Sequence, residues 1–253
     1  MAGHSHSSNI AVRKGKQDRL RARIFSKLSK NIMIAARGGP DPAMNFSLRH
    51  AVELARAQSM PKDKIEHAIK KGAGLVEGIK VQELTYEAYG PSGVALLIDC
   101  VTDNINRTRP EIISVLDKSN AKIAEANSVK WMFKRRGYLA VKKDAVAEDK
   151  LMDIVLTAGA DDMAPAEDVY EILTTIETFE TVKKALDEAK IATTMSEMKH
   201  IPENVVDADA ETARKVLTIV ERLEEVDDVN SVHHNMKITP EVQAIMKQMA
   251  DAD

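Results

Sequence analysis

The residues best suited to chemistry form a polar cluster that closely follows an apolar run. Val94 to Cys100 is almost wholly apolar, as in a strand covered on both faces, and Thr102-Asp103-Asn104 and Asn106-Arg107-Thr108 come after it. The end of a strand and the start of a helix would hold these side chains in place. Thr108 and Asn106 suit the capping of helix amides, whereas Asn and Arg also suit recognition of a phosphate or a base edge. Both interpretations stay open, because one does not exclude the other.

Other reactive residue types do not converge. Cys100 ends an apolar strand, so we expect a buried and unreactive thiol. Neighbours on a strand point to opposite faces, so His233 and His234 cannot share one ligand. We therefore expect no enzyme, no catalytic residue, no cofactor and no functional metal. An amino terminus at Ala2-Gly3-His4 would be an adventitious copper(II) or nickel(II) site, because it offers an amine, two amides and an imidazole in series.

Charge is the strongest chemical signal. Residues 1–80 carry 16 Lys and Arg against 6 Asp and Glu, whereas residues 144–253 carry 10 against 26, within a net charge of −3. So many cations with few acidic partners favour contact with a polyanion, that is, nucleic acid bound mainly through its phosphates. The candidate nucleic-acid-binding residues are Arg13, Lys14, Lys16, Arg19, Arg23, Lys27, Lys30, Lys62, Lys70, Lys71, Asn104, Asn106 and Arg107.

The elements that position these residues follow from apolar periodicity. After an extended or mobile arm over residues 1–16, three helices are predicted: one from Gln17, one capped by Asn45 and one opened by Pro61. Residues 72–80 are typical of a linker. Two strands around the turn Gly90-Pro91-Ser92-Gly93 come next, and Thr108-Arg109-Pro110-Glu111 matches a capping box that would start a helix.

The second half alternates strands and helices. Val129 to Phe133 is predicted as a strand, and the residues from Gly137 to about 199 follow a β-α-β-β-α-β order, typical of a ferredoxin-like unit. The segment before that unit lacks one helix and one closing strand, which residues after 203 would supply. We expect an α+β protein with a basic three-helix domain and two ferredoxin-like α/β domains, the third inserted into the second. The predicted bounds are 1–78, 79–135 with 203–240, 136–202, and a tail over 241–253.

Several motifs resemble the YebC/PmpR family. They include Arg23-Ile-Phe-Ser-Lys-Leu28, Met60-Pro-Lys-Asp-Lys-Ile-Glu-His-Ala-Ile-Lys-Lys-Gly72, Tyr86–Thr108 and Ser128-Val-Lys-Trp-Met-Phe133. The resemblance spans nearly the whole chain and implies three domains, with the third nested in the second. It also implies a DNA-binding transcriptional regulator, or a ribosome-associated activator that helps translation of proline-rich sequences.

The expected partner is therefore nucleic acid, either DNA or ribosomal RNA. An adaptor that uses its acidic surface to bind a protein partner is a remote alternative. The single cysteine and the absence of a membrane-length apolar run favour a cytoplasmic protein without membrane contact, and we expect a monomer.

Overall fold

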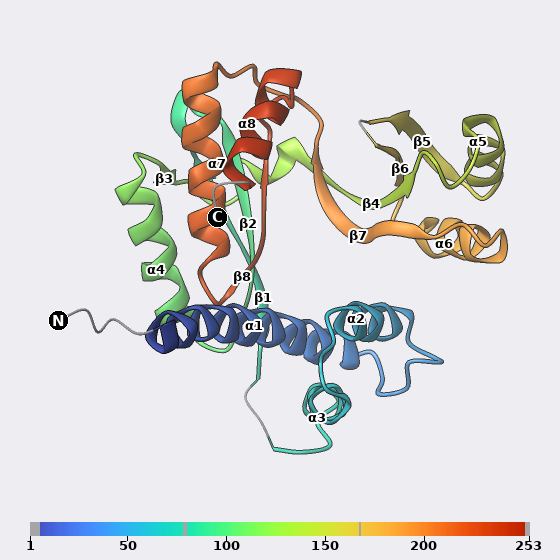
Figure 1. Ribbon diagram of the computed structural model, residues 1–253, viewed down its shortest axis with the longest axis horizontal. Coiled ribbons are helices and arrows are strands. Elements are labelled where there is room, and N and C mark those ends of the chain that lie inside the picture. Colours follow the sequence, from blue (N-terminus) through green and yellow to red (C-terminus); the bar gives the residue numbers. More distant parts are fainter. Residues whose placement is uncertain (1–5, 78–79, 167, 251–253) are drawn as a thin grey trace. The chain divides into compact units, whose positions relative to one another are not determined.

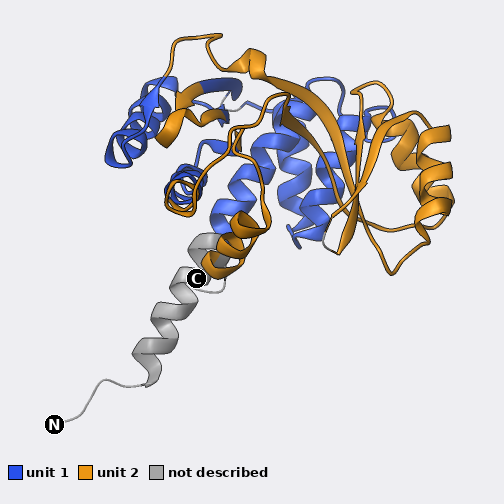
Figure 2. Ribbon diagram, turned by 90° about the horizontal axis from the view of Figure 1, so that it is seen from above, with its two compact units in different colours: residues 1–86, 98–123, 215–232 blue, residues 87–97, 124–214, 233–253 orange. Residues whose placement is uncertain are grey.

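The computed structural model describes residues 6–77, 80–166 and 168–250, with side chains from residue 21 to residue 249. The chain forms two compact units (Figure 2). The first unit contains residues 1–86, 98–123 and 215–232, and the second contains residues 87–97, 124–214 and 233–253. Among the described helices, none combines the length and the apolar character needed to cross a membrane.

Three helices open the first unit: α1 (His6–Ala36), α2 (Phe46–Ala57) and α3 (Lys62–Gly72) (Figure 1). They pack around fully buried Ile32, Leu48 and Ala55. Asn45 caps α2 as predicted, because its side chain accepts a hydrogen bond from the Leu48 amide at 3.1 Å. Residues 6–16 were expected in an extended or mobile arm; they are helical and belong to α1, so the extended alternative is wrong for them. Residues 6–16 contain no proline, and a single glycine costs a helix only about 1 kcal/mol.

A four-stranded sheet has the order β3-β1-β2-β8. The predicted hairpin is present as β1 (Gln82–Tyr89) and β2 (Ala95–Thr102), joined by the short 3-10 turn η1 (Pro91–Gly93). The edge strands are the short β3 (Lys122–Ile123), which was not predicted, and β8 (Val229–His234). Leu96, Leu97 and Ile98 of β2 are fully buried. This sheet is therefore completed by a strand that lies far along the chain from its hairpin.

Along the chain, the helix α4 (Ile105–Lys118) follows β2, and the helix α7 (Ala210–Glu224) precedes β8. Helix α4 begins earlier than predicted, since Asn104 is its N-cap and accepts a hydrogen bond from the Arg107 amide at 3.2 Å. Thr108 is therefore not a cap but a buried residue of the helix. The apolar stripe of α7 is buried at Ala213, Val216 and Leu223.

The second sheet has the order β5-β6-β4-β7 and lies within the second unit. Its chain order is β4 (Phe133–Lys142), α5 (Glu148–Thr157), β5 (Ala160–Pro165), β6 (Val169–Thr174), α6 (Phe179–Glu188) and β7 (Thr193–Pro202). Strand β4 pairs antiparallel with both β6 and β7, and α5 lies beside α6 (Figure 1). This is the predicted ferredoxin-like order, and the α+β fold class is confirmed. The positions of the domain boundaries stay a prediction.

Two further segments differ from expectation. Of the strand predicted over residues 129–133, only Phe133 lies in a strand, as the first residue of β4, because Lys130–Met132 is a 3-10 turn, η2. The amides of Asn127, Val129 and Lys130 all donate to the side chain of Glu87, which bends the segment away from any ladder. The predicted tail contains the helix α8 (Pro240–Ala250), which buries Val242 and Ile245.

Candidate nucleic-acid interface

The predicted basic residues fall into groups with different surroundings. Arg13, Lys14, Lys16 and Arg19 lie in the part of α1 whose side chains are not described, and Ala2, Gly3 and His4 lie outside the described residues. On α3, Lys62 and Lys70 are exposed and Lys71 is half-buried. Lys62 reaches Glu66 at 3.6 Å, an exposed pair one turn apart that contributes little to stability.

Three predicted residues on α1 face the carboxyl end of α7. Lys27 Nζ donates to the Glu224 carbonyl oxygen at 2.7 Å, and Lys30 Nζ donates to the Asp227 carbonyl oxygen at 3.1 Å. Arg23 Nε lies 3.3 Å from an Asp227 carboxylate oxygen. Cations are favoured at the carboxyl end of a helix, where carbonyl groups lack helical partners. Burial lowers the pKa of Lys27, and the nearby Glu224 offsets this only in part.

A buried carboxylate joins α1 to α4. Asp228 is 1% exposed and accepts from Lys30 Nζ at 2.6 Å, from Arg107 Nη2 at 2.7 Å and from the Thr108 hydroxyl at 2.8 Å. Burial alone would raise the pKa of Asp228, but these three hydrogen bonds lower it overall. Hydrogen bonds to Asp228 and to Asp103 raise the pKa of Arg107, and the Asp103 bond is 2.7 Å long. Arg107, a predicted contact to nucleic acid, is thus held by two carboxylates.

An open hollow of about 480 Å³ lies beside this network, all within the first unit. The structure brings three predicted residues together in its lining, namely Lys30, Lys71 and Arg107. Four carboxylates also line it and outnumber the three cations; they belong to Asp103, Glu111, Asp227 and Asp228. A phosphate would meet carboxylates there, and the hollow is a poor anion site.

The asparagines of the polar cluster separate into two roles. The N-cap of α4 is Asn104, not Asn106 or Thr108, which were the residues expected to cap the helix. Asn106 is exposed in the first turn of α4. An exposed amide at this position suits contact with a ligand.

Exposed cations also gather around Phe25, which the sequence analysis did not include in the site. The Arg21 guanidinium lies 5.4 Å and the Lys64 ammonium 5.5 Å from the centre of the Phe25 ring. Both cations are exposed, and they come from α1 and α3. Such contacts position charge without neutralising it. A pattern of Arg and Phe one helical turn apart was the available signal.

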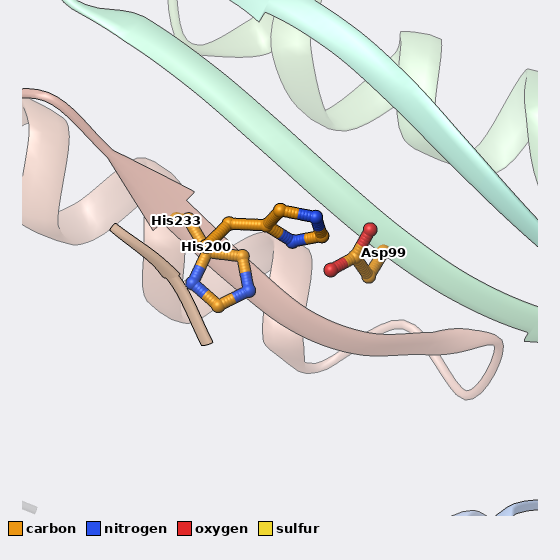
Figure 3. Close-up of side chains that lie close together, drawn as sticks. All are labelled: Asp99, His200 and His233. Carbon is orange, nitrogen blue, oxygen red and sulfur yellow. The ribbon is translucent and has the colours of Figure 1, made fainter. Parts of the chain in front are cut away.

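The cysteine of this chain is buried, and two of its described histidines lie against each other. Cys100 is 1% exposed, and burial with nearby Asp99 and Asp228 raises the pKa of its thiol to about 12. The His233 ring lies edge-on to the His200 ring, with centroids 5.2 Å apart (Figure 3). Asp99, also drawn in Figure 3, accepts a hydrogen bond from the Thr85 hydroxyl at 2.9 Å. Burial and the neighbouring His233 lower the pKa of His234.

A second group that the sequence analysis did not include lies around η2 in the second unit. Trp131 is 63% and Tyr89 36% exposed, and both donate to the Ser128 carbonyl oxygen, at 3.0 and 3.1 Å. The dipeptide Lys130-Trp131 was the signal in the sequence, because aromatic and basic residues side by side are typical of nucleic-acid-binding surfaces.

Comparison with known proteins covers most of the chain. Residues 5–75 match the TACO1/YebC protein N-terminal domain, and residues 81–236 match the TACO1/YebC second and third domain. A probable transcriptional regulatory protein of Maridesulfovibrio salexigens is 43% identical over 247 residues, which are 98% of this chain and 100% of that protein. Another, of Chlorobaculum parvum, is 44% identical over 250 residues, with the same two coverages.

A solved structure also matches. The crystal structure of a conserved hypothetical protein from Aquifex aeolicus has a TM-score of 0.79 to this chain and is 39% identical to it. The match covers 87% of this chain and 91% of that one. The structural similarity therefore extends over most of this chain.

Proposed function

Because this chain belongs to the TACO1/YebC family, we propose that it is a regulator of gene expression that binds nucleic acid through the basic helices α1 and α3. The family resemblance seen in the sequence is thereby confirmed, and the relatives are named as probable transcriptional regulators. Duplex DNA is accordingly the first target to test. Ribosomal RNA is the alternative, since phosphate contacts of this kind serve either polymer.

One observation carries the proposal. Arg21 and Lys64 are exposed, come from different helices and both lie against the Phe25 ring, so two positive charges gather at one place. The other exposed lysines of α3, Lys62 and Lys70, extend the positive surface. Phosphate neutralisation by such residues releases counterions, so affinity should fall steeply as salt is raised.

The acidic-adaptor alternative has less support. The backbone carbonyls of Glu224 and Asp227 and the carboxylate of Asp228 bind lysines of α1 in the same unit. This part of the acidic half is therefore already occupied within the chain. We assign no catalytic step, because the buried Cys100 thiol does not ionise near neutral pH.

The test is a salt titration of the full chain with a labelled DNA duplex and a labelled RNA of the same sequence. Replacing Arg21 and Lys64 by Gln keeps most of each side chain but removes two charges. The slope of log affinity against log salt should become shallower by about two. Lys184→Gln, on the exposed surface of α6, is the matched control and should leave the slope unchanged. An unaltered slope in the double variant would contradict the proposal.

A further inference from the structure

The exposed aromatic pair of Tyr89 and Trp131 in the second unit has no role in the function proposed so far. The chain is only 4% aromatic and has a single tryptophan, yet that residue is 63% exposed. Exposure of such a large apolar ring is unfavourable unless the ring contacts something. Both polar edges, the indole N–H and the phenol O–H, are satisfied by one carbonyl oxygen, that of Ser128. The ring faces therefore remain as the surface that these side chains offer.

Glu87 fixes the backbone turn that carries Trp131. Its carboxylate, 6% exposed, accepts from the amides of Asn127, Val129 and Lys130 at 2.6, 2.6 and 2.8 Å. Burial would raise the pKa of Glu87, but the three amides lower it overall, so the group stays ionised at neutral pH. The turn that carries Trp131 is therefore fixed before any ligand arrives, which reduces the entropy lost on binding.

Four cations lie close to Trp131 in the sequence. Lys130, Lys134 and Arg135 are all exposed, and with Arg136 they place four cations within seven consecutive residues. Lys134 pairs with Glu203 and Arg136 pairs with Asp161. Lys130 directly precedes Trp131, on the same turn η2. An exposed ring on the same turn as an exposed lysine fits a nucleotide, whose base stacks on the ring while its phosphate is neutralised.

We propose that Tyr89 and Trp131 form a stacking site for unpaired bases of single-stranded nucleic acid, with Lys130 contacting the adjoining phosphate. This deepens the proposed function and rests on it. A paired duplex hides its base faces, so the site selects single strands or loops. A proline-rich peptide also packs on aromatic rings, but it has no phosphate for the neighbouring cations.

The sole tryptophan provides a direct readout. Full-length protein is titrated with end-labelled oligouridylate, the matching oligodeoxyuridylate, the duplex that oligouridylate forms with oligoadenylate, and a polyproline peptide. Label anisotropy reports nucleic-acid binding, and tryptophan emission reports stacking at Trp131. We expect both single strands to quench the emission, and the duplex to bind without quenching.

Variants separate stacking from simple charge attraction. Trp131→Ala should weaken single-strand binding by roughly tenfold, the lower range for loss of one stacked base. Trp131→Phe keeps a ring and should recover most of that affinity, while duplex affinity stays unchanged in both variants. Ile176→Ala removes a similarly exposed apolar side chain, 51% exposed, and is the control. Because Trp131 is mostly exposed, unaltered circular dichroism is expected for its variants.

Three outcomes would overturn the site. If single strands bind with unchanged emission and Trp131→Ala binds equally well, the stacking site is wrong while the proposed function stands. If quenching occurs with polyproline and not with either oligonucleotide, the ligand class is wrong. If the protein leaves the anisotropy of every labelled nucleic acid unchanged, both the proposed function and the stacking site are wrong.

Discussion

At the scale of single residues, Asp228 is the carboxylate on which the charges of the first unit converge. It is 1% exposed and receives hydrogen bonds from α1, through Lys30, and from α4, through Arg107 and Thr108. A buried charge with this many donors stabilises an arrangement mainly because its removal leaves the donors unpaired. The Lys30 side chain is only 13% exposed, so water cannot easily replace Asp228 as its hydrogen-bond acceptor.

We expect Asp228→Asn to lower the free energy of unfolding by about 1–3 kcal/mol. Breaking a fully buried pair costs roughly 3–5 kcal/mol, and the estimate is reduced because the Arg107 side chain is 44% exposed. Urea unfolding followed by circular dichroism measures the change. Asp227→Asn is the matched control, since the Asp227 side chain is 72% exposed, and it should change stability by less than about 1 kcal/mol. Equal effects of the two variants would contradict the role given to Asp228.

The same carboxylate should make stability depend on pH. Its pKa in the folded protein is below the ordinary value of about 3.9, so the folded state binds this proton less readily than the unfolded state. The stabilisation is complete above that ordinary value and is lost as the pH falls through the lower, folded pKa. The stability difference between the unmodified protein and Asp228→Asn should therefore shrink below about pH 4. A difference that is constant down to pH 3 would count against this assignment.

At the scale of elements, α1 and α3 approach each other closely at Gly72. A side-chain carbon built on Gly72 would lie 2.7 Å from the Met33 Cα and closer still to the Met33 carbonyl oxygen. Because the opposing atoms belong to the Met33 backbone, no change of side-chain rotamer can relieve the contact. Any larger residue at position 72 must push the two helices apart.

Gly72→Ala should therefore destabilise the protein, although alanine is the better helix former. The gain in helix propensity is at most about 1 kcal/mol, whereas overpacking costs about 1–3 kcal/mol. The melting temperature, measured by thermal unfolding, shows whether Gly72→Ala stabilises or destabilises the protein. The control is His67→Ala, at an exposed position on the same helix, which should be neutral or slightly stabilising. A higher melting temperature for Gly72→Ala would show that the helices separate at little cost.

Local patterns predicted most elements, because their causes lie within a few residues. The Asn45 cap, the turn at Gly90 to Gly93 and the β-α-β-β-α-β order are examples of this kind. The failures have distant causes. Residues 129–133 alternate like a strand but are bent by Glu87, more than 40 positions earlier in the sequence for Val129 and Lys130. No pattern within the segment contains that information.

The candidate site was predictable in composition but not in pairing. Counting charge identified the basic helices, and Lys62 and Lys70 are indeed exposed. Lys27 instead binds the Glu224 carbonyl, 197 positions away, which a scan of neighbouring residues cannot find. Trp131 was not predicted as a site residue, because the sequence does not show which apolar side chains of a segment stay exposed after folding. Its apolar neighbours Val129 and Phe133 are buried.

At the scale of the whole molecule, the acidic and basic halves of the sequence partly neutralise each other. Asp227 lies 3.3 Å from Arg23, which is a candidate contact for nucleic acid. An exposed carboxylate beside such a contact repels a phosphate and competes for the guanidinium. Only part of the basic surplus of residues 1–80 is therefore available to a polyanion.

Removal of that carboxylate should strengthen nucleic-acid binding. We expect Asp227→Asn to raise affinity up to about fivefold at low salt, the equivalent of about 1 kcal/mol, with the gain fading as salt screens it. Fluorescence anisotropy with a labelled duplex measures the effect. Asp187→Asn removes an exposed acid on α6 and serves as the control. Equal gains from both variants would mean that only total charge matters.

The pairing of β4 with β7 has a consequence for the order in which the chain folds. Strand β2 ends at Thr102 and β8 begins at Val229, so their union closes a very long loop. Phe133 and Pro202 lie opposite each other at the ends of β4 and β7, so the ends of the intervening sheet lie side by side once it has formed. The loop that β2 and β8 must then close is effectively shorter. Each halving of loop length saves about 0.6 kcal/mol of chain entropy. We therefore expect residues 133–202 to form their sheet before β2 and β8 pair.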